Sequence, residues 1–206
     1  MKKVCKLCVV VVMLASALIL CLPTGEERKI YDMTLRLHVL ANSDDQKDQE
    51  NKLAVRDRVL ELLSDRLAAC ENVAQAEQIV VDQRDAIVQA CRQELARLGA
   101  EDEVSLVLDR EYYPTRHYED ISLPAGNYLS LRICIGQAEG QNWWCVLYPP
   151  VCLEACTSKK TLSQAGFSDS QIHLVTNEGG VRYKIKFKIL QTVSSWMDAL
   201  SSKKSS

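Results

Sequence analysis

Two residues in the chain could support nucleophilic chemistry: a histidine, His38, and a cysteine in an aromatic stretch, Cys145. A cysteine thiolate activated by a histidine base is a nucleophile in hydrolytic enzymes. The two residues are far apart in the sequence, so this chemistry requires the fold to bring the sulfur within about 4 Å of an imidazole nitrogen. A hydrogen-bonded histidine at the end of a strand is the simpler interpretation of His38.

Three aspartates that follow this histidine are candidate calcium ligands: Asp44, Asp45 and Asp48. Their spacing lacks the glycine and the terminal glutamate of a calcium-binding loop. Negative charge at the start of a helix, where it compensates the helix dipole, explains them better. A zinc site is also disfavoured, because no C-x-x-C pair follows the first 25 residues. We therefore expect no catalytic residues, no metal site and no cofactor.

The stretch that must position these side chains is LRLHVLANSDDQKDQENKLAVRDRVL at residues 35–60. Alternating apolar residues predict a strand over residues 35–41. The run Asn42-Ser43-Asp44-Asp45 consists of helix-capping residue types, and Ser43 with Gln46 fits a capping box. An apolar stripe at helical spacing then predicts a helix from about residue 44 to about residue 69.

Further elements follow from the periodicity of the apolar residues. A second helix is expected to start at Asn72, which with Gln75 makes a second plausible cap, and to end at Gly99. At most one short helix is expected near Leu162, in the poorly patterned segment 151–180, and a further short helix at residues 193–200. Alternation predicts strands at residues 104–108, 128–135, 143–148 and 181–189, with residues 136–141 as a hairpin loop and residues 110–123 as an irregular or partly extended connection.

This order of elements predicts an α+β fold: a mostly antiparallel sheet with a long two-helix hairpin packed on one face. The tight connection between the two long helices favours the hairpin. We expect residues 26–200 to form one domain and residues 201–206 to be a disordered tail. The strand order does not follow from the sequence.

The first segment indicates the compartment. Three lysines precede an uncharged apolar run at residues 7–22, which is the pattern of an export signal. The run is shorter than the roughly 20 residues that a membrane-spanning helix needs. Residues 1–25 are therefore expected to be an export signal, either cleaved or retained as a membrane anchor. A lipoprotein signal ending at Cys21 fits loosely, because Leu20 is bulky where a small residue is needed.

The charge of the rest of the chain excludes one class of function. Beyond residue 25 the chain has 22 basic and 27 acidic residues, a net charge of −5. A nucleic-acid-binding protein would need a basic face. We therefore expect no nucleic-acid partner, and membrane contact through the N-terminal signal only.

Six cysteines follow residue 25, an even number that permits disulfides in an exported domain. We expect Cys70 and Cys91 to be reduced and buried, because small core positions are the usual place of a free cysteine. The sequence leaves the other pairings open, with Cys134 and Cys145 as possible cross-strand neighbours and Cys152 and Cys156 as local neighbours.

Two blocks of the sequence carry a resemblance to a known family. The first block comprises Arg36, Leu37, His38, Val39, Ala41, Asn42, Ser43, Asp44, Asp48, Gln49, Lys52, Val55, Arg56 and Asp57. The second block is NWWCVLYPPVC at residues 142–152, preceded by LPAGNY at residues 123–128 and by Gly136. Two long blocks in this order resemble the stage II sporulation protein R family, over roughly residues 31–189.

The resemblance implies a function. Members of that family are made in the forespore and are exported across its membrane into the space between the forespore and mother-cell membranes. There they trigger a membrane-embedded aspartic peptidase, which processes pro-sigma-E in the mother cell. The resemblance therefore implies a signalling protein without enzymatic activity, whose partner is this peptidase. The alternatives are a cell-envelope cysteine hydrolase using Cys145 and His38, and a protein that binds glycans through an exposed tryptophan.

Candidate partner-binding residues come from both blocks. Trp143 and Trp144 are adjacent in a predicted strand, so their rings should point to opposite faces of the sheet. If the ends of the two strands meet at one edge of the sheet, they form a polar patch around an aromatic anchor, which is the composition of an interface hot spot. The residues expected to contact the peptidase are His38, Asn42, Ser43, Asp44, Asp48, Arg56, Trp143, Trp144, Pro149 and Pro150.

Overall fold

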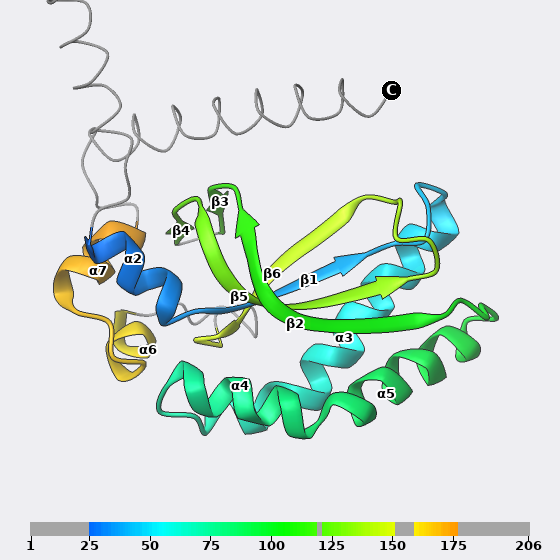
Figure 1. Cartoon of the computed structure of the whole chain (residues 1–206), viewed down its shortest axis with the longest axis horizontal. Helices are drawn as coiled ribbons and strands as arrows, with labels where there is room; N and C mark the ends of the chain where they lie inside the picture. Colours follow the sequence, from blue (N-terminus) through cyan, green and yellow to red (C-terminus); the bar gives the residue numbers. More distant parts are fainter. Residues whose placement is uncertain (1–24, 119–120, 151–158, 177–206) are drawn as a thin grey trace, which may run out of the picture.

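The structure, a computed structural model, describes residues 25–118, 121–150 and 159–176 (Figure 1). Its helices are α2 (Gly25–Asp32), α3 (Gln46–Ala68), α4 (Val73–Asp82), α5 (Arg84–Arg97), α6 (Lys159–Gln164) and α7 (Asp169–Val175). Its strands are β1 (Leu35–Leu40), β2 (Val104–Tyr113), β3 (Arg116–His117), β4 (Ser122–Leu123), β5 (Gly126–Ile135) and β6 (Asn142–Tyr148). The predicted α+β class is confirmed.

The main sheet has four strands in the order β2-β5-β1-β6, and β3 pairs with β4 in a small second sheet. The predicted antiparallel character is confirmed for most of the main sheet, because β2 pairs antiparallel with β5 and β1 pairs antiparallel with β6. The pair of β1 and β5 is parallel. Residues Leu35 to Val39 of β1 are all buried, as expected for a strand with neighbours on both sides and packed elements on both faces.

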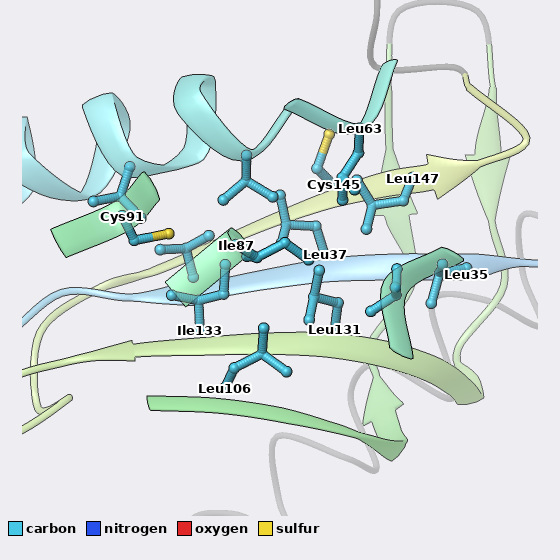
Figure 2. Close-up of a cluster of buried hydrophobic side chains, with 14 of the residues drawn as sticks. Leu35, Leu37, Leu63, Ile87, Cys91, Leu106, Leu131, Ile133, Cys145 and Leu147 are labelled. Carbon is cyan, nitrogen blue, oxygen red and sulfur yellow. The ribbon is translucent and has the colours of Figure 1, made fainter. Parts of the chain in front are cut away.

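One face of the sheet packs against α3, α4 and α5. Figure 2 shows side chains from strands and helices meeting in this layer, among them Leu37, Leu63, Ile87, Leu106 and Ile133. The apolar residues of α3 that face the sheet, Val55, Val59, Leu63 and Leu67, repeat at the spacing of one helical face. Burial of these side chains holds α3 along the strands, and the direction of α3 then fixes the turn that leads into it.

The other face carries a second core rich in aromatic residues. Helices α2, α6 and α7 and the β3–β4 pair contribute to it, and they gather at the end of the molecule where β1 begins (Figure 1). Tyr113 and Tyr128 are fully buried there, and Tyr31 packs edge-on against Tyr128 with ring centroids 4.9 Å apart. This second core does not extend over the opposite end of β1, where the β1–α3 turn lies.

The predicted two-helix hairpin is wrong in one respect: its second arm is two helices. The chain breaks at Gln83, which ends α4 and begins α5. The stripe of buried apolar residues is interrupted between Val80 and Ile87, because the position that would continue it falls on the polar residues Gln83 and Arg84. Arg84 instead donates to the carbonyl oxygen of Leu106 in β2 at 2.6 Å. A single straight helix would need an apolar side chain facing the sheet at this position. The chain has an arginine there, and it makes a polar contact with the sheet.

The predicted hairpin of the strands at 128–135 and 143–148 is also wrong. These strands are β5 and β6, and β1 lies between them. Leu40 of β1 pairs with Cys134 on one side and with Asn142 on the other, so Cys134 and Cys145 are not cross-strand neighbours. Alternation identifies a strand but carries no information about its neighbours.

Several boundaries match the predictions. Asn72 caps α4, accepting from the backbone N–H of Gln75 at 3.0 Å, and Gly99 follows α5 with a φ of 71°. The expected helix near Leu162 is α6, whereas α7 was not predicted. The segment at 110–123, expected to be irregular or partly extended, contains the end of β2 and the strands β3 and β4. Predictions for residues 1–24, 181–189, 193–200 and 201–206 fall outside the described residues.

The cysteines partly follow expectation. Cys91 is a buried free cysteine, and burial raises the pKa of its thiol to about 12. Cys70 is free but only partly buried, so the prediction of full burial is wrong for this residue. It follows α3, packs against the edge of the core, and its thiol donates to the carbonyl oxygen of Arg66 at 3.4 Å.

Candidate partner-binding surface

The β1–α3 turn is closed by side chains, but not by the predicted capping box. The N-cap of α3 is Asp45, whose side chain makes no cap hydrogen bond. Ser43 instead donates to a carboxylate oxygen of Asp48 at 2.7 Å and accepts from the backbone N–H of Asp45 at 3.1 Å. The amide of Asn42 donates to the same oxygen of Asp48 at 2.9 Å. These two hydrogen bonds lower the pKa of Asp48, and the one from Ser43 has the larger effect.

This turn also holds the loop between β5 and β6. Four backbone N–H groups of that loop donate to it. They are Gln137 to the side chain of Asn42 at 2.9 Å, Glu139 to the carbonyl of Asn42 at 3.2 Å, Gly140 to the carbonyl of Ala41 at 3.0 Å and Gln141 to the carboxylate of Asp44 at 2.7 Å. The polar residues of the first sequence block thus bind the segment that leads into the second block.

A buried lysine connects α3 to the same loop. Lys52 is 4% exposed, and its ammonium group donates to the carbonyl oxygen of Gln141 at 2.9 Å and to the side chain of Gln49 at 2.6 Å. Burial lowers the pKa of Lys52. A lysine this deeply buried is rare unless it is paired, so the two acceptors account for its place beside the core.

Trp143 follows directly from this loop and is 37% exposed, on the face of β6 that points toward α3. The guanidinium carbon of Arg56 in α3 lies 4.3 Å from the centroid of its ring, within the range of a cation–π contact. Arg56 also pairs with Asp57 at 2.6 Å. We call the region formed by Asn42, Ser43, Asp44, Asp48, Arg56 and Trp143 the turn surface.

His38 and Trp144 lie on the opposite face of the sheet. His38 is 5% exposed, with Nδ1 at 2.9 Å from a carboxylate oxygen of Glu111 and Nε2 at 2.6 Å from the side-chain oxygen of Asn142. Burial raises the pKa of Glu111, but the hydrogen bonds with His38 and Ser130 and the electrostatic interactions with His38 and Arg132 lower it, and the net pKa is lowered. The ring of Trp144 lies 5.4 Å from the imidazole. His38 is therefore a hydrogen-bonded residue inside the protein.

A fully buried arginine next to His38 was not predicted. The guanidinium carbon of Arg36 lies 4.1 Å from the ring centroid of Tyr113 and 5.0 Å from that of Tyr128. Arg36 also donates to the hydroxyl of Tyr118 and to the carbonyl oxygen of Cys145. Alternation with leucines suggests a solvent-facing arginine, and the only sequence signal to the contrary is the excess of tyrosine in the segment at 110–123.

The arrangement rules out the hydrolase that uses Cys145 and His38. Cys145 pairs with Leu37 and belongs to the core beneath the helices, whereas His38 faces the other side of the sheet. Cys145 is also disulfide-bonded, so it has no free thiol to act as a nucleophile.

The ten candidate residues fall into three places. Six form the turn surface, and His38 and Trp144 lie on the opposite sheet face. Pro149 and Pro150 follow the far end of β6, where Tyr148 pairs with Leu35 at the start of β1. The two sequence blocks therefore meet at the turn surface through Trp143, and the prolines are separated from it by the length of β6.

Comparison with known proteins gives the family. The family profile described as stage II sporulation protein R matches residues 31–158. The chain belongs to the stage II sporulation protein R family. It is 30% identical over 160 residues to the stage II sporulation protein R of Bacillus subtilis (strain 168), a match that covers 74% of this chain and 71% of that protein. No solved structure matches.

The described residues of this family member lack the features of two other kinds of site. Within residues 25–118, 121–150 and 159–176, no cluster of three His, Cys, Asp or Glu side chains could hold a metal ion. Over the same part of the chain, none of the helices is long and apolar enough to cross a membrane.

Replacing Ser43 with alanine tests the contacts of the turn. The substitution removes one hydrogen bond to Asp48 and one from Asp45, so we expect the free energy of unfolding to fall by about 0.5–1.5 kcal/mol in urea titrations. Ser64→Ala is the matched control, because Ser64 is partly exposed on α3 and its hydroxyl donates to the carbonyl of Glu61 in the same helix. Equal stability of Ser43→Ala and the native protein would contradict these contacts.

The lowered pKa of Asp48 predicts a pH dependence. A carboxylate whose pKa is lower in the folded state stabilises the protein above the ordinary carboxyl range, and this contribution is lost as the pH falls through the folded value. The difference in unfolding free energy between the native protein and Asp48→Asn should therefore shrink between about pH 6 and about pH 3. A difference that stays constant over this range would show that Asp48 has no lowered pKa.

Proposed function

We propose that this protein is an exported sporulation signal that activates a membrane-embedded aspartic peptidase, which then processes pro-sigma-E in the mother cell. The observation that carries the proposal is Trp143, a large exposed aromatic side chain held on the turn surface, where the two sequence blocks of the family meet. An aromatic anchor ringed by polar side chains is the usual make-up of an interface hot spot.

The hydrogen bonds that hold the turn surface favour binding. The loop before Trp143 is held by four hydrogen bonds from its backbone N–H groups to the β1–α3 turn, and by Lys52. A surface that is ordered before binding loses less conformational freedom on association. Arg56 adds a charged group beside the ring, and arginine is enriched at binding hot spots.

The proposed mechanism is a shift in the conformation of the peptidase. The protein would bind the outward-facing part of the peptidase through the turn surface and favour its active arrangement, which can include a dimer. A partner shifts a conformational equilibrium only by binding one state more tightly than another. No catalytic residue of this chain takes part, and the peptidase carries out the cleavage.

Export of the chain is part of the proposal. The N-terminal run of three lysines and an apolar segment has the form of an export signal. The disulfide at Cys145 supports the same location, because structural disulfides form mainly in proteins that fold outside the reducing cytoplasm. We place the protein between the forespore and mother-cell membranes, either secreted or anchored by residues 1–25.

Co-expression tests this function. The peptidase and pro-sigma-E are produced together in a host that lacks both, with or without this chain, and the processed product is measured on immunoblots. We expect processing only when the full chain is present and exported. A chain without residues 1–24 is the control, since it lacks the export signal but keeps the described fold. Equal processing with and without the full chain would contradict the proposal.

A further inference from the structure

Gln141 connects the β1–α3 turn to Trp143, and charged side chains hold both polar groups of its backbone. Its N–H donates to a carboxylate oxygen of Asp44 at 2.7 Å, and its carbonyl oxygen accepts from the ammonium group of Lys52 at 2.9 Å. These two contacts fix the peptide groups on either side of Gln141. We call Asp44, Lys52 and Gln141 the charged clamp.

The lysine of the clamp and the arginine of the cation–π contact lie on the same face of α3. Lys52 and Arg56 are four residues apart, so they lie one above the other on the helix surface. Lys52 holds the backbone two residues before Trp143, and Arg56 stacks on the ring of Trp143 at 4.3 Å. One helix thus fixes both the backbone entry and the ring of the exposed anchor.

We propose that Lys52 and Asp44 are positioning residues that fix Trp143, and that Lys52 acts on the peptidase only through this side chain and not by contact with it. This inference rests on the proposed function of the turn surface. Lys52 is 4% exposed and cannot present its ammonium group to a partner. Asp44 is exposed, but one of its carboxylate oxygens is engaged by Gln141. The clamp fixes the direction of the Trp143 side chain before the partner arrives.

The first test measures the environment of Trp143 directly. The full chain is labelled with 5-fluorotryptophan, which gives three fluorine resonances. The resonance of Trp143 is the one that is lost in Trp143→Phe. We expect Lys52→Met and Asp44→Ala to shift or broaden the Trp143 resonance and to leave the others in place. Asp44→Asn, which keeps an oxygen acceptor, should leave the resonance near its native position. Arg66→Met removes a charge from the far part of the same helix and is the control.

Asp44→Ala keeps this test decisive even if Lys52→Met does not fold, because Asp44 lies at the surface and its removal leaves no cavity in the core. An unchanged Trp143 resonance in a folded Asp44→Ala or Lys52→Met chain would overturn the clamp. A shift of all three resonances together would also overturn it, because that pattern indicates a general change of the fold.

The second test is a double-mutant cycle in the co-expression assay. We expect Lys52→Met to lower the processing rate by about tenfold. Combining it with Trp143→Ala should give the same rate as Trp143→Ala alone, because Lys52 acts through that ring. Losses that multiply in the double variant would show that Lys52 acts independently of Trp143, and would overturn the inference.

The outcomes separate this inference from the proposed function. If the peptidase processes pro-sigma-E at the native rate with Trp143→Ala, the turn surface does not dock, and both the docking proposal and the clamp fail. If Trp143→Ala fails to activate processing while Lys52→Met and Asp44→Ala activate it fully, the docking surface stands and the clamp alone is wrong.

Discussion

Replacing Trp143 with alanine should lower pro-sigma-E processing by about thirtyfold or more while leaving the protein folded and exported. The side chain is 37% exposed and contacts Arg56 on its inner side, so its loss removes little of the core. Truncation of a central aromatic anchor typically costs about 2 kcal/mol or more of binding free energy. The measurement is the initial rate of product formation in the co-expression assay, at matched amounts of exported protein.

Val81→Ala is the matched control for Trp143→Ala. Val81 is 51% exposed on α4, far along the chain from the turn surface, and its loss should leave the processing rate unchanged. If Trp143→Ala were as active as Val81→Ala, the anchor would lie elsewhere on the molecule. Export is checked separately, since a failure to leave the cell would imitate a loss of binding.

Replacing Gly140 with alanine should destabilise the fold by about 1–3 kcal/mol, the usual cost of forcing atoms into a packed site. A Cβ at this position would lie 2.1 Å from the carbonyl oxygen of Ser43 and 2.9 Å from the Cβ of Ala41. The nearest atom belongs to the backbone of the turn, so a side-chain rotation cannot relieve the clash. The measurement is the free energy of unfolding in urea.

Gly25→Ala is the control for this substitution. Gly25 begins α2, and a Cβ there meets nothing within 4 Å, so the change should alter the stability by less than about 0.5 kcal/mol. Similar stabilities of Gly140→Ala and Gly25→Ala would mean that the β5–β6 loop does not lie against the β1–α3 turn.

Local pattern was enough to predict most elements of the fold. Alternation located β1, β5 and β6, and the residue types at Asn72 and Gly99 marked the ends of two helices. The insertion of β1 between β5 and β6 was not predictable, because alternation specifies which face a strand buries and not which strand lies beside it. The break at Gln83 was missed because it depends on the contact between Arg84 and Leu106 in the sheet.

The candidate site shows the same division. The sequence predicted that Trp143 and Trp144 face opposite ways, which the cores on the two sheet faces confirm. It did not predict that Ser43 would bond to Asp48, or that Lys52 would reach the carbonyl of Gln141. These contacts join residues that the fold brings together, and the residue types alone allow other pairings. The resemblance to the family included Lys52 among the matching residues but assigned it no contact.

The most direct test of the docking proposal is photo-crosslinking from the turn surface. A photoreactive phenylalanine analogue is placed at position 143 or, as the control, at position 81, and cells that produce the full chain with the peptidase are irradiated. The docking proposal predicts a crosslink to the peptidase from position 143 and none from position 81. A crosslink from position 81 alone, or no crosslink from position 143 in a chain that still activates processing, would contradict it.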